Sequence, residues 1–356
     1  KAISFLLVDF SCALKISTPV AYLTAIKEGL NREMVIKDGD VLEKYLEVDT
    51  FLFDKTGTIT TSYPLVEKVL PFGDYNEEDI LRISACLEEH IYHPIASAVV
   101  SKAEEDGIEH EEMHTELYHI ASKGIVSHID GEKVVIGSRQ LLKDEDVVVT
   151  DEQEQIIAEK QEQYNLLFLG YKGKLISIFC VDIPLRDEAS AVLTELRNRG
   201  KKVVLLTGDS ELRTKKILKD VTFDEVHTSM TPVTKFEYIK SEKEQGRRVL
   251  MIGDGLNDSA ALSKANVGVV MASSSDIARQ ASDIVFLEET LSGILVLDDI
   301  SAQLQKQLGR NLNTTVWVNT SLMGLGLFNL LTPSTLAVFH NLTTTVIIGK
   351  SFTYIK

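Results

Sequence analysis

The sequence predicts an α/β protein built on a doubly wound parallel sheet, with a smaller α+β module inserted into it and apolar helices at both ends. Short apolar runs alternate with helical patterns, as at residues 50–53, 202–206 and 248–252. Each of these runs stops at a cluster of Asp, Gly and Thr residues. Ligands of an open α/β sheet bind beyond the carboxyl ends of its strands, so we expect the three clusters to share one edge.

Composition narrows the classes of protein to which the chain can belong. Its 356 residues are enough for two or three domains. The net charge of −16 argues against a nucleic-acid partner, because the phosphates would be repelled. The three cysteines, Cys12, Cys86 and Cys180, form no CxxC pair, which excludes a disulfide framework and a zinc ribbon.

Both ends of the chain are poor in charge. No charged side chain occurs from Leu312 to Gly349, and this run divides at Pro333 into two halves close to the ~20 residues that cross a bilayer. A third apolar run extends from Ala2 to about Ile26 and is broken by Pro19. We therefore expect one transmembrane helix within residues 1–30 and two within 306–356. A buried helical hairpin in a soluble domain is the alternative for the second stretch.

The middle of the chain divides into a sheet domain and an insertion. Residues 31–62 are expected to supply the first segment of the sheet domain and residues 177–305 its second segment. Residues 63–176 read as a module with its own core. It has helices at about 77–89 and 95–105, followed by short strands around a central antiparallel sheet.

The residues at the strand ends suit phosphoryl transfer. Asp54 ends the first strand and can act as a nucleophile, giving an aspartyl-phosphate. The alternative for Asp54 alone is a solvated aspartate in a turn. Thr207 offers a hydroxyl to a phosphoryl oxygen, and Lys235 can neutralise its charge. Asp254 and Asp258 are hard oxygen ligands suited to Mg²⁺.

In these strings the chain resembles the P-type ATPases, a branch of the haloacid-dehalogenase-like superfamily. The matching strings are Asp54-Lys55-Thr56-Gly57-Thr58, Thr207-Gly208-Asp209 and Gly253-Asp254-Gly255-Leu256-Asn257-Asp258. The resemblance implies that the catalytic site comprises Asp54, Lys55, Thr56, Thr207, Gly208, Asp209 and Lys235. It implies a Mg²⁺ site made by Asp54, Thr56, Asp254 and Asp258.

Two further motifs resemble those of the transition-metal-transporting group. His93-Pro94 lies in the inserted module, which implies that the module binds ATP through Glu88, His93, Gly124 and Ile125. For His93 alone, a helix-capping or core histidine is the alternative. Cys12, in the first apolar run, and His340, near the end, would be ligands of the transported metal, since thiolates and imidazoles bind transition metals. For His340, helix–helix hydrogen bonding is the alternative.

The resemblance implies the catalytic part of an ATP-driven transition-metal pump, with ATP, Mg²⁺ and the metal cation as its ligands. Its other partners would be a lipid membrane, an actuator domain and earlier membrane helices, since no Thr-Gly-Glu loop occurs and the chain begins abruptly. We expect an integral protein of the cell membrane with its catalytic domains in the cytoplasm. The alternatives are a soluble phosphatase of the same superfamily and a non-enzymatic metal-binding membrane protein. Which metal is moved, and in which direction, stays open.

Overall fold

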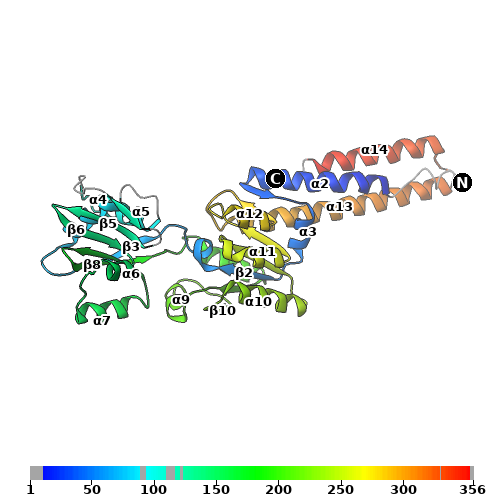
Figure 1. Ribbon diagram of the computed structural model, residues 1–356. Coiled ribbons are helices and arrows are strands. Elements are labelled where there is room, and N and C mark those ends of the chain that lie inside the picture. Colours follow the sequence, from blue (N-terminus) through cyan, green and yellow to red (C-terminus); the bar gives the residue numbers. More distant parts are fainter. Residues whose placement is uncertain (1–10, 89–93, 110–116, 121–122, 329, 353–356) are drawn as a thin grey trace. The chain divides into compact units, whose positions relative to one another are not determined.

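A computed structural model describes residues 11–88, 94–109, 117–120, 123–328 and 330–352 of the chain. They form two compact units (Figure 1). The first unit comprises the residues up to Thr58, Glu188–Leu206, and the chain from Phe223 onward. The second comprises Ile59–Asp187 and Thr207–Thr222.

The first unit contains a seven-stranded sheet in the order β1-β13-β12-β11-β2-β9-β10. All neighbours in it are parallel except β1 and β13, which are antiparallel. The strands are β1 (Met34–Ile36), β2 (Thr50–Asp54), β9 (Lys202–Leu206), β10 (Glu225–His227), β11 (Val249–Gly253), β12 (Val267–Val270) and β13 (Ile284–Phe286). The predicted doubly wound sheet is thereby confirmed, and β2 lies inside it between β11 and β9. Strand β1 was not predicted.

Helices cover both faces of this sheet, as its continuously apolar central strands require. One face packs on α10 (Pro232–Glu244), α11 (Ser259–Lys264) and α12 (Asp276–Ala281). Helix α3 (Asp40–Leu46) contacts β12, and helix α8 (Ala189–Asn198) contacts β9. Helix α13 (Gly293–Leu327) contacts both α3 and α8. The Tyr45 ring of α3 meets Phe51 of β2 edge-on, with ring centroids 6.1 Å apart.

The second unit contains a six-stranded sheet in the order β3-β8-β7-β6-β5-β4, antiparallel throughout. Its strands are β3 (Leu65–Pro71), β4 (Tyr118–Ile120), β5 (Gly124–Ile129), β6 (Glu132–Gly137), β7 (Asn165–Tyr171) and β8 (Lys174–Asp182). The sequence predicts strands at about residues 118–120, 125–129, 133–136, 166–171 and 175–181, and five of the six observed strands match these to within two residues at each end. The exception is β3, where exposed residues such as Leu65 and Glu67 alternate with buried ones.

Alternating residues of these strands enter two separate cores. Ile125 and Ile129 pack on the side of α4 (Glu77–Glu88) and α5 (Pro94–Glu105). Val126 packs on the opposite side with α6 (Arg139–Asp144) and α7 (Asp151–Lys160). A further helix, α9 (Glu211–Ile217), belongs to this unit. Its Lys216 bonds to Glu67 and Asp182, each at 2.5 Å.

Three helices of the first unit lie alongside one another, namely α2 (Ser11–Asn31), α13 and α14 (Pro333–Ser351) (Figure 1). The predicted break at Pro19 does not occur. Helix α2 runs through Pro19 and continues to Asn31, losing only the hydrogen bond for which proline has no N–H. Helix α13 crosses the predicted boundary at residue 306 without a break, because no Pro or turn signal interrupts residues 293–327.

Among the residues that the structure describes, no helix combines the length and the apolar character needed to cross a membrane. The expectation of transmembrane helices within residues 1–30 and 306–356 is therefore wrong for the described part of those ranges. The physical reason lies in composition, since absence of charge is not enough. Amide and hydroxyl side chains lower the hydropathy of both C-terminal helices, as in Asn311–Thr315 of α13 and His340–Thr345 of α14.

Candidate functional site

Asp54 is the last residue of β2, the strand that lies between β9 and β11. Strand β2 is buried along its whole length, and only 8% of Asp54 is exposed. Its neighbours place the ends of two other strands beside it. Asp54 pairs with Leu206 of β9, and the preceding Phe53 pairs with Ile252 of β11. The predicted meeting of strand ends is thus seen for β2, β9 and β11.

The turn after Asp54 depends on Gly57. Its φ of +70° lies in the left-handed region that favours glycine. The space beside it is also closed, because a Cβ atom built on Gly57 would lie 1.7 Å from Oδ2 of Asp254. The positive φ and the closed space each exclude a side chain at this position. Gly57 therefore allows the Asp54 motif and the Asp254 motif to approach each other.

Lys235 reaches into the same place from α10. That helix starts in a capping box in which Thr231 and Thr234 each bond the other's backbone N–H, and Pro232 holds the first turn. The Lys235 ammonium donates hydrogen bonds to Oδ1 of Asp54 and, at 2.8 Å, to Oδ1 of Asp258. Only 6% of Lys235 is exposed, so this lysine is a fixed cation of the site.

Three carboxylates surround that single cation. Oxygen atoms of Asp54, Asp254 and Asp258 all lie within 4.8 Å of one another. Burial, with the charge of Asp258, raises the pKa of Asp54 to about 6 against the opposing effect of Lys235. Burial and the charges of Asp54 and Asp258 raise the pKa of Asp254 to about 7. The residues present therefore suit a hard divalent cation, since the oxygen atoms of three carboxylates converge beside a single positively charged side chain.

The second motif is connected directly to this strand edge. Thr207 follows Leu206, the residue that pairs with Asp54. Thr207 is buried, and its hydroxyl accepts a hydrogen bond of 3.1 Å from the N–H of Asp209. The loop Thr207–Asp209 belongs to the second unit. Lys55 and Thr56 follow Asp54 in the turn.

The second unit has a cavity of about 190 Å³ on its sheet. Glu88, Gly124 and Ile125, three of the four residues predicted for nucleotide contact, line it together. The fourth, His93, lies outside the described residues. Burial raises the pKa of Glu88 to about 7. His119, Lys123, Gly137 and Ser138 also line the cavity and were not predicted.

Gly137 is the clearest omission of the sequence reasoning. It pairs directly with Gly124 across β5 and β6. A Cβ atom on Gly137 would lie 2.2 Å from the carbonyl oxygen of Lys123, and one on Gly124 would lie 2.2 Å from that of Ile136. The two backbones therefore approach each other only as glycines. The sequence feature that could have identified Gly137 is its position at the end of a strand, directly before Ser138, whose side chain caps α6.

The two predicted transport ligands lie on the helices beside α13. His340 of α14 is buried, and its Nδ1 lies 3.2 Å from Oδ1 of Asn319 on α13. Cys12 is in the first turn of α2, and its side chain lies outside the described part of the chain. His340 thus makes the helix–helix hydrogen bond that was its alternative.

A row of buried polar residues on α13 was not predicted. Gln307, Asn311, Thr315 and Asn319 recur every four residues and are each 4% exposed or less. The Gln307 amide donates to Asn311 at 3.0 Å, and the Asn311 amide donates to Ser351 of α14 at 2.9 Å. The fourfold spacing was the available signal, because residues four apart share a face of a helix.

Comparison with known proteins agrees with this geometry. The family described as haloacid dehalogenase-like hydrolase matches residues 48–266, well over half of the chain. The chain therefore belongs to the haloacid dehalogenase-like hydrolases. That match spans the Asp54, Lys235 and Asp254–Asp258 positions just described.

Several metal-exporting P-type ATPases are similar to the chain over most or all of its length. Over 360 residues the chain is 31% identical to a zinc-exporting P-type ATPase of Mycobacterium marinum, covering 100% of this chain and 49% of the relative. It is 30% identical to a manganese-exporting P-type ATPase of Mycobacterium bovis, covering 100% of this chain and 50% of the relative. A probable copper-exporting P-type ATPase V of Mycobacterium tuberculosis is 30% identical, with 93% and 43% covered. The chain spans about half the length of these relatives.

Solved structures show the same fold. The crystal structure of a zinc-transporting PIB-type ATPase in the E2.Pi state has a TM-score of 0.79 at 24% identity, covering 97% of this chain and 56% of that one. A structure of the catalytic domain of the CPx-ATPase CopB-B, from work on nucleotide binding, has a TM-score of 0.61 at 28% identity. It covers 78% of this chain and 98% of that one.

Proposed function

We propose that this chain is the catalytic part of an ATP-driven transition-metal pump that forms an aspartyl-phosphate on Asp54. One observation carries the proposal. A buried aspartate at the carboxyl end of a central strand touches a buried lysine and lies among two further carboxylates. The names of the curated relatives supply the reaction class and favour it over the alternative, a phosphatase of the same superfamily.

The reaction balances with these residues alone. A carboxylate oxygen of Asp54 forms a bond to the γ-phosphorus of ATP, and the bond from that phosphorus to the bridging oxygen breaks, so that ADP leaves with the electron pair. Lys235 donates hydrogen bonds where negative charge gathers on the transferring group, and it is already in place before the reaction begins. The hydroxyl of Thr207 and the adjoining residues Gly208 and Asp209 would hold the phosphoryl oxygens.

Asp54, Thr56, Asp254 and Asp258 would hold a Mg²⁺ ion. The bound ion would supply positive charge to the phosphoryl oxygens. Asp258 holds Lys235 at 2.8 Å, so it orients the lysine as well. Gly57 lets Asp254 approach the turn after Asp54, and Lys55 and Thr56 shape that turn.

ATP would bind in the cavity of the second unit. Glu88, Gly124 and Ile125 line it, and we assign His93 to the same task. The facing glycines Gly124 and Gly137 leave flat backbone where a planar base can lie. Because burial raises the pKa of Glu88 to about 7, this carboxyl can donate or accept a hydrogen bond near neutral pH.

The transported cation would contact Cys12 and His340. The remainder of the pump, with an actuator domain and membrane helices, would be the partner of this chain. The pump would lie in the cell membrane and use ATP from the cytoplasm. The relatives' names include zinc, manganese and copper, so the identity of the metal is left to experiment.

Labelling with γ-³²P-ATP and Mg²⁺ tests the nucleophile. The 356-residue chain should acquire an acid-stable label that hydroxylamine removes, and Asp54→Asn should acquire none. Asp49→Asn is the matched control, because Asp49 immediately precedes the same strand at its opposite end, and its carboxylate accepts hydrogen bonds from the Thr50 hydroxyl and the Arg248 N–H. A label that persists in Asp54→Asn, or that is absent from the unchanged chain, contradicts the proposal.

The transport ligands require a separate measurement on the pump assembled with its remaining helices. ATPase activity would be measured across Mn, Fe, Co, Ni, Cu, Zn and Cd for the unchanged protein, Cys12→Ala and His340→Ala. We expect one metal to stimulate the unchanged pump and each variant to lose that stimulation. Full stimulation in both variants would remove this pair from the transport site.

A further inference from the structure

Helix α10, which carries Lys235, turns two charged residues toward the sheet. The buried residues of this helix are Lys235, Ile239 and Glu242. They are four and three residues apart, so they share one face. Ile239 packs in the apolar core beneath. A buried carboxylate such as Glu242 is costly unless a cation meets it, so the partner of Glu242 determines how the helix can sit.

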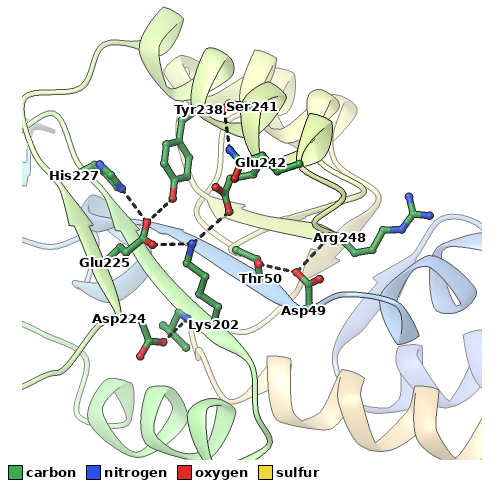
Figure 2. Close-up of polar contacts among 12 residues, drawn as sticks. Asp49, Thr50, Lys202, Asp224, Glu225, His227, Tyr238, Ser241, Glu242 and Arg248 are labelled. Atoms are coloured by element: carbon green, nitrogen blue, oxygen red, sulfur yellow. Dashed lines mark hydrogen bonds and ion pairs between the residues drawn. The ribbon is translucent and has the colours of Figure 1, made fainter.

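That partner is Lys202, the first residue of β9. Its ammonium lies 2.8 Å from Oε1 of Glu225 on β10 and 3.4 Å from Oε2 of Glu242 (Figure 2). Lys202 thus links the sheet to the helix, with one carboxylate on each. In Figure 2 its side chain extends from the strand into the space between them. The carboxylates raise the pKa of Lys202 although burial opposes this, so the link is charged at neutral pH.

Tyr238 makes a second link one turn away on the same helix. Its hydroxyl donates to Oε2 of Glu225 at 2.8 Å (Figure 2). His227 also approaches Oε2 of Glu225, at 3.3 Å, and its ring lies 4.6 Å from that of Tyr238. Glu225 therefore collects contacts from β9, β10 and α10. Hydrogen bonds from Lys202 and Tyr238 hold the pKa of Glu225 down to about 2.

We propose that Lys202, Glu225, Tyr238 and Glu242 act as positioning residues for Lys235. Tyr238 and Glu242 lie three and seven residues beyond Lys235 in α10, so their two links oppose rotation of the helix about its axis and sliding along it. Either motion would withdraw the ammonium from Asp54 and Asp258. The inference rests on the proposed function in one respect, which is that Lys235 acts on the phosphoryl group received by Asp54.

A role in stability alone does not account for these charges. A buried ion pair is often no more stable than apolar side chains of the same volume, because removing the charges from water offsets their attraction. Apolar residues at positions 202 and 242 would cover the sheet as well. Apolar packing is not directional, so it would not hold the helix in one orientation about its axis. An ion pair between two specific atoms does.

The test is Lys202→Met in the 356-residue chain, with the phosphorylation rate followed over a range of ATP concentrations. We expect the rate at saturating ATP to fall about tenfold or more, since misplacing a catalytic group by ~1 Å can cost ~10²-fold. The KM for ATP should not change, because the cavity lies in the other unit. Lys202→Arg, which keeps a cation able to reach two carboxylates, should restore most of the rate.

Lys201→Met is the matched control. The adjacent Lys201 donates to the carbonyl oxygen of Val48 and makes no bond to α10 in the described contacts, so its loss should leave the rate unchanged. Tyr238→Phe removes one hydroxyl and should lower the rate about threefold at constant KM. If Lys202→Met does not fold, the rate of Tyr238→Phe tests the positioning role instead.

Three results would overturn the inference. They are an unchanged rate in Lys202→Met and Tyr238→Phe, equal impairment in Lys202→Met and Lys202→Arg, and a raised KM at constant maximal rate. Failure of the unchanged chain to form a phosphoenzyme is a different result. That result would contradict the proposed function. If the unchanged chain is labelled and the variants are fully active, only the positioning role is contradicted.

Discussion

Replacing Gly57 by alanine should disable phosphorylation while costing little more stability than a control substitution. The added Cβ would lie 1.7 Å from Oδ2 and 2.4 Å from Cγ of Asp254. Real Cβ contacts do not fall below 3.0 Å, so 3.0 minus 1.7 means that Oδ2 must withdraw by at least 1.3 Å. Because misplacing a catalytic group by ~1 Å can cost ~10²-fold, we expect a loss on the order of 10²-fold in phosphorylation rate.

Gly246→Ala separates that effect from backbone strain. Gly246 lies in the same unit with φ +87°, and nothing lies within 4 Å of its Cβ position. Both variants place alanine in the left-handed region, at a cost of ~1–2 kcal/mol in the free energy of unfolding. Chemical denaturation would measure this shared cost, and labelling with γ-³²P-ATP would measure the rate. A Gly57→Ala chain that is phosphorylated as fast as Gly246→Ala would refute the assignment of Asp254 to the site.

Two further predictions concern the cavity of the second unit. The raised pKa of Glu88 means that its protonated form is favoured on folding, so its contribution to stability is present below the ordinary value of 4.5 and is lost as the pH rises through about 7. Denaturation between about pH 5 and pH 8 should therefore show the module losing on the order of 2 kcal/mol, and Glu88→Gln should abolish that dependence. Gly137→Ala places a Cβ 2.2 Å from the carbonyl oxygen of Lys123, so it should destabilise the module by about 2 kcal/mol or more and weaken ATP binding in a titration. Gly131→Ala, whose Cβ would meet open space in the adjacent hairpin, should leave ATP binding unchanged, and an equal loss in both variants would contradict the packing argument.

The strands were the predictable part of the fold. In the seven-stranded sheet, the interiors of β2, β9 and β11 are apolar, and each strand ends at a recognisable cluster, so the sequence revealed both their limits and their shared edge. Strand β1 escaped because it has only three residues, with Val35 exposed between two buried neighbours. So short an edge strand forms through its pairing with β13, and that pairing has no local signal.

Helices with charged or polar inner faces were the part that patterns could not predict. The inward face of α10 carries Lys235 and Glu242, so it lacks the apolar stripe by which a helix is usually oriented. In α13 the buried row includes Gln307 and Asn311, whose amides are satisfied within the helix or by Ser351 of α14. Such faces follow from specific partners elsewhere in the chain, and only the tertiary structure shows which partner meets which residue.

The arrangement of charge explains why the predicted ligands belong to one site. Each aspartate was predicted from its own motif, and no motif by itself requires a divalent ion. Together, Asp54, Asp254 and Asp258 carry three negative charges against the single positive charge of Lys235, all of it largely shielded from water. The raised pKa values of Asp54 and Asp254 are the physical expression of that imbalance, because protons would be taken up where cations are lacking. The cluster lacks two positive charges, which is the charge that one Mg²⁺ would supply.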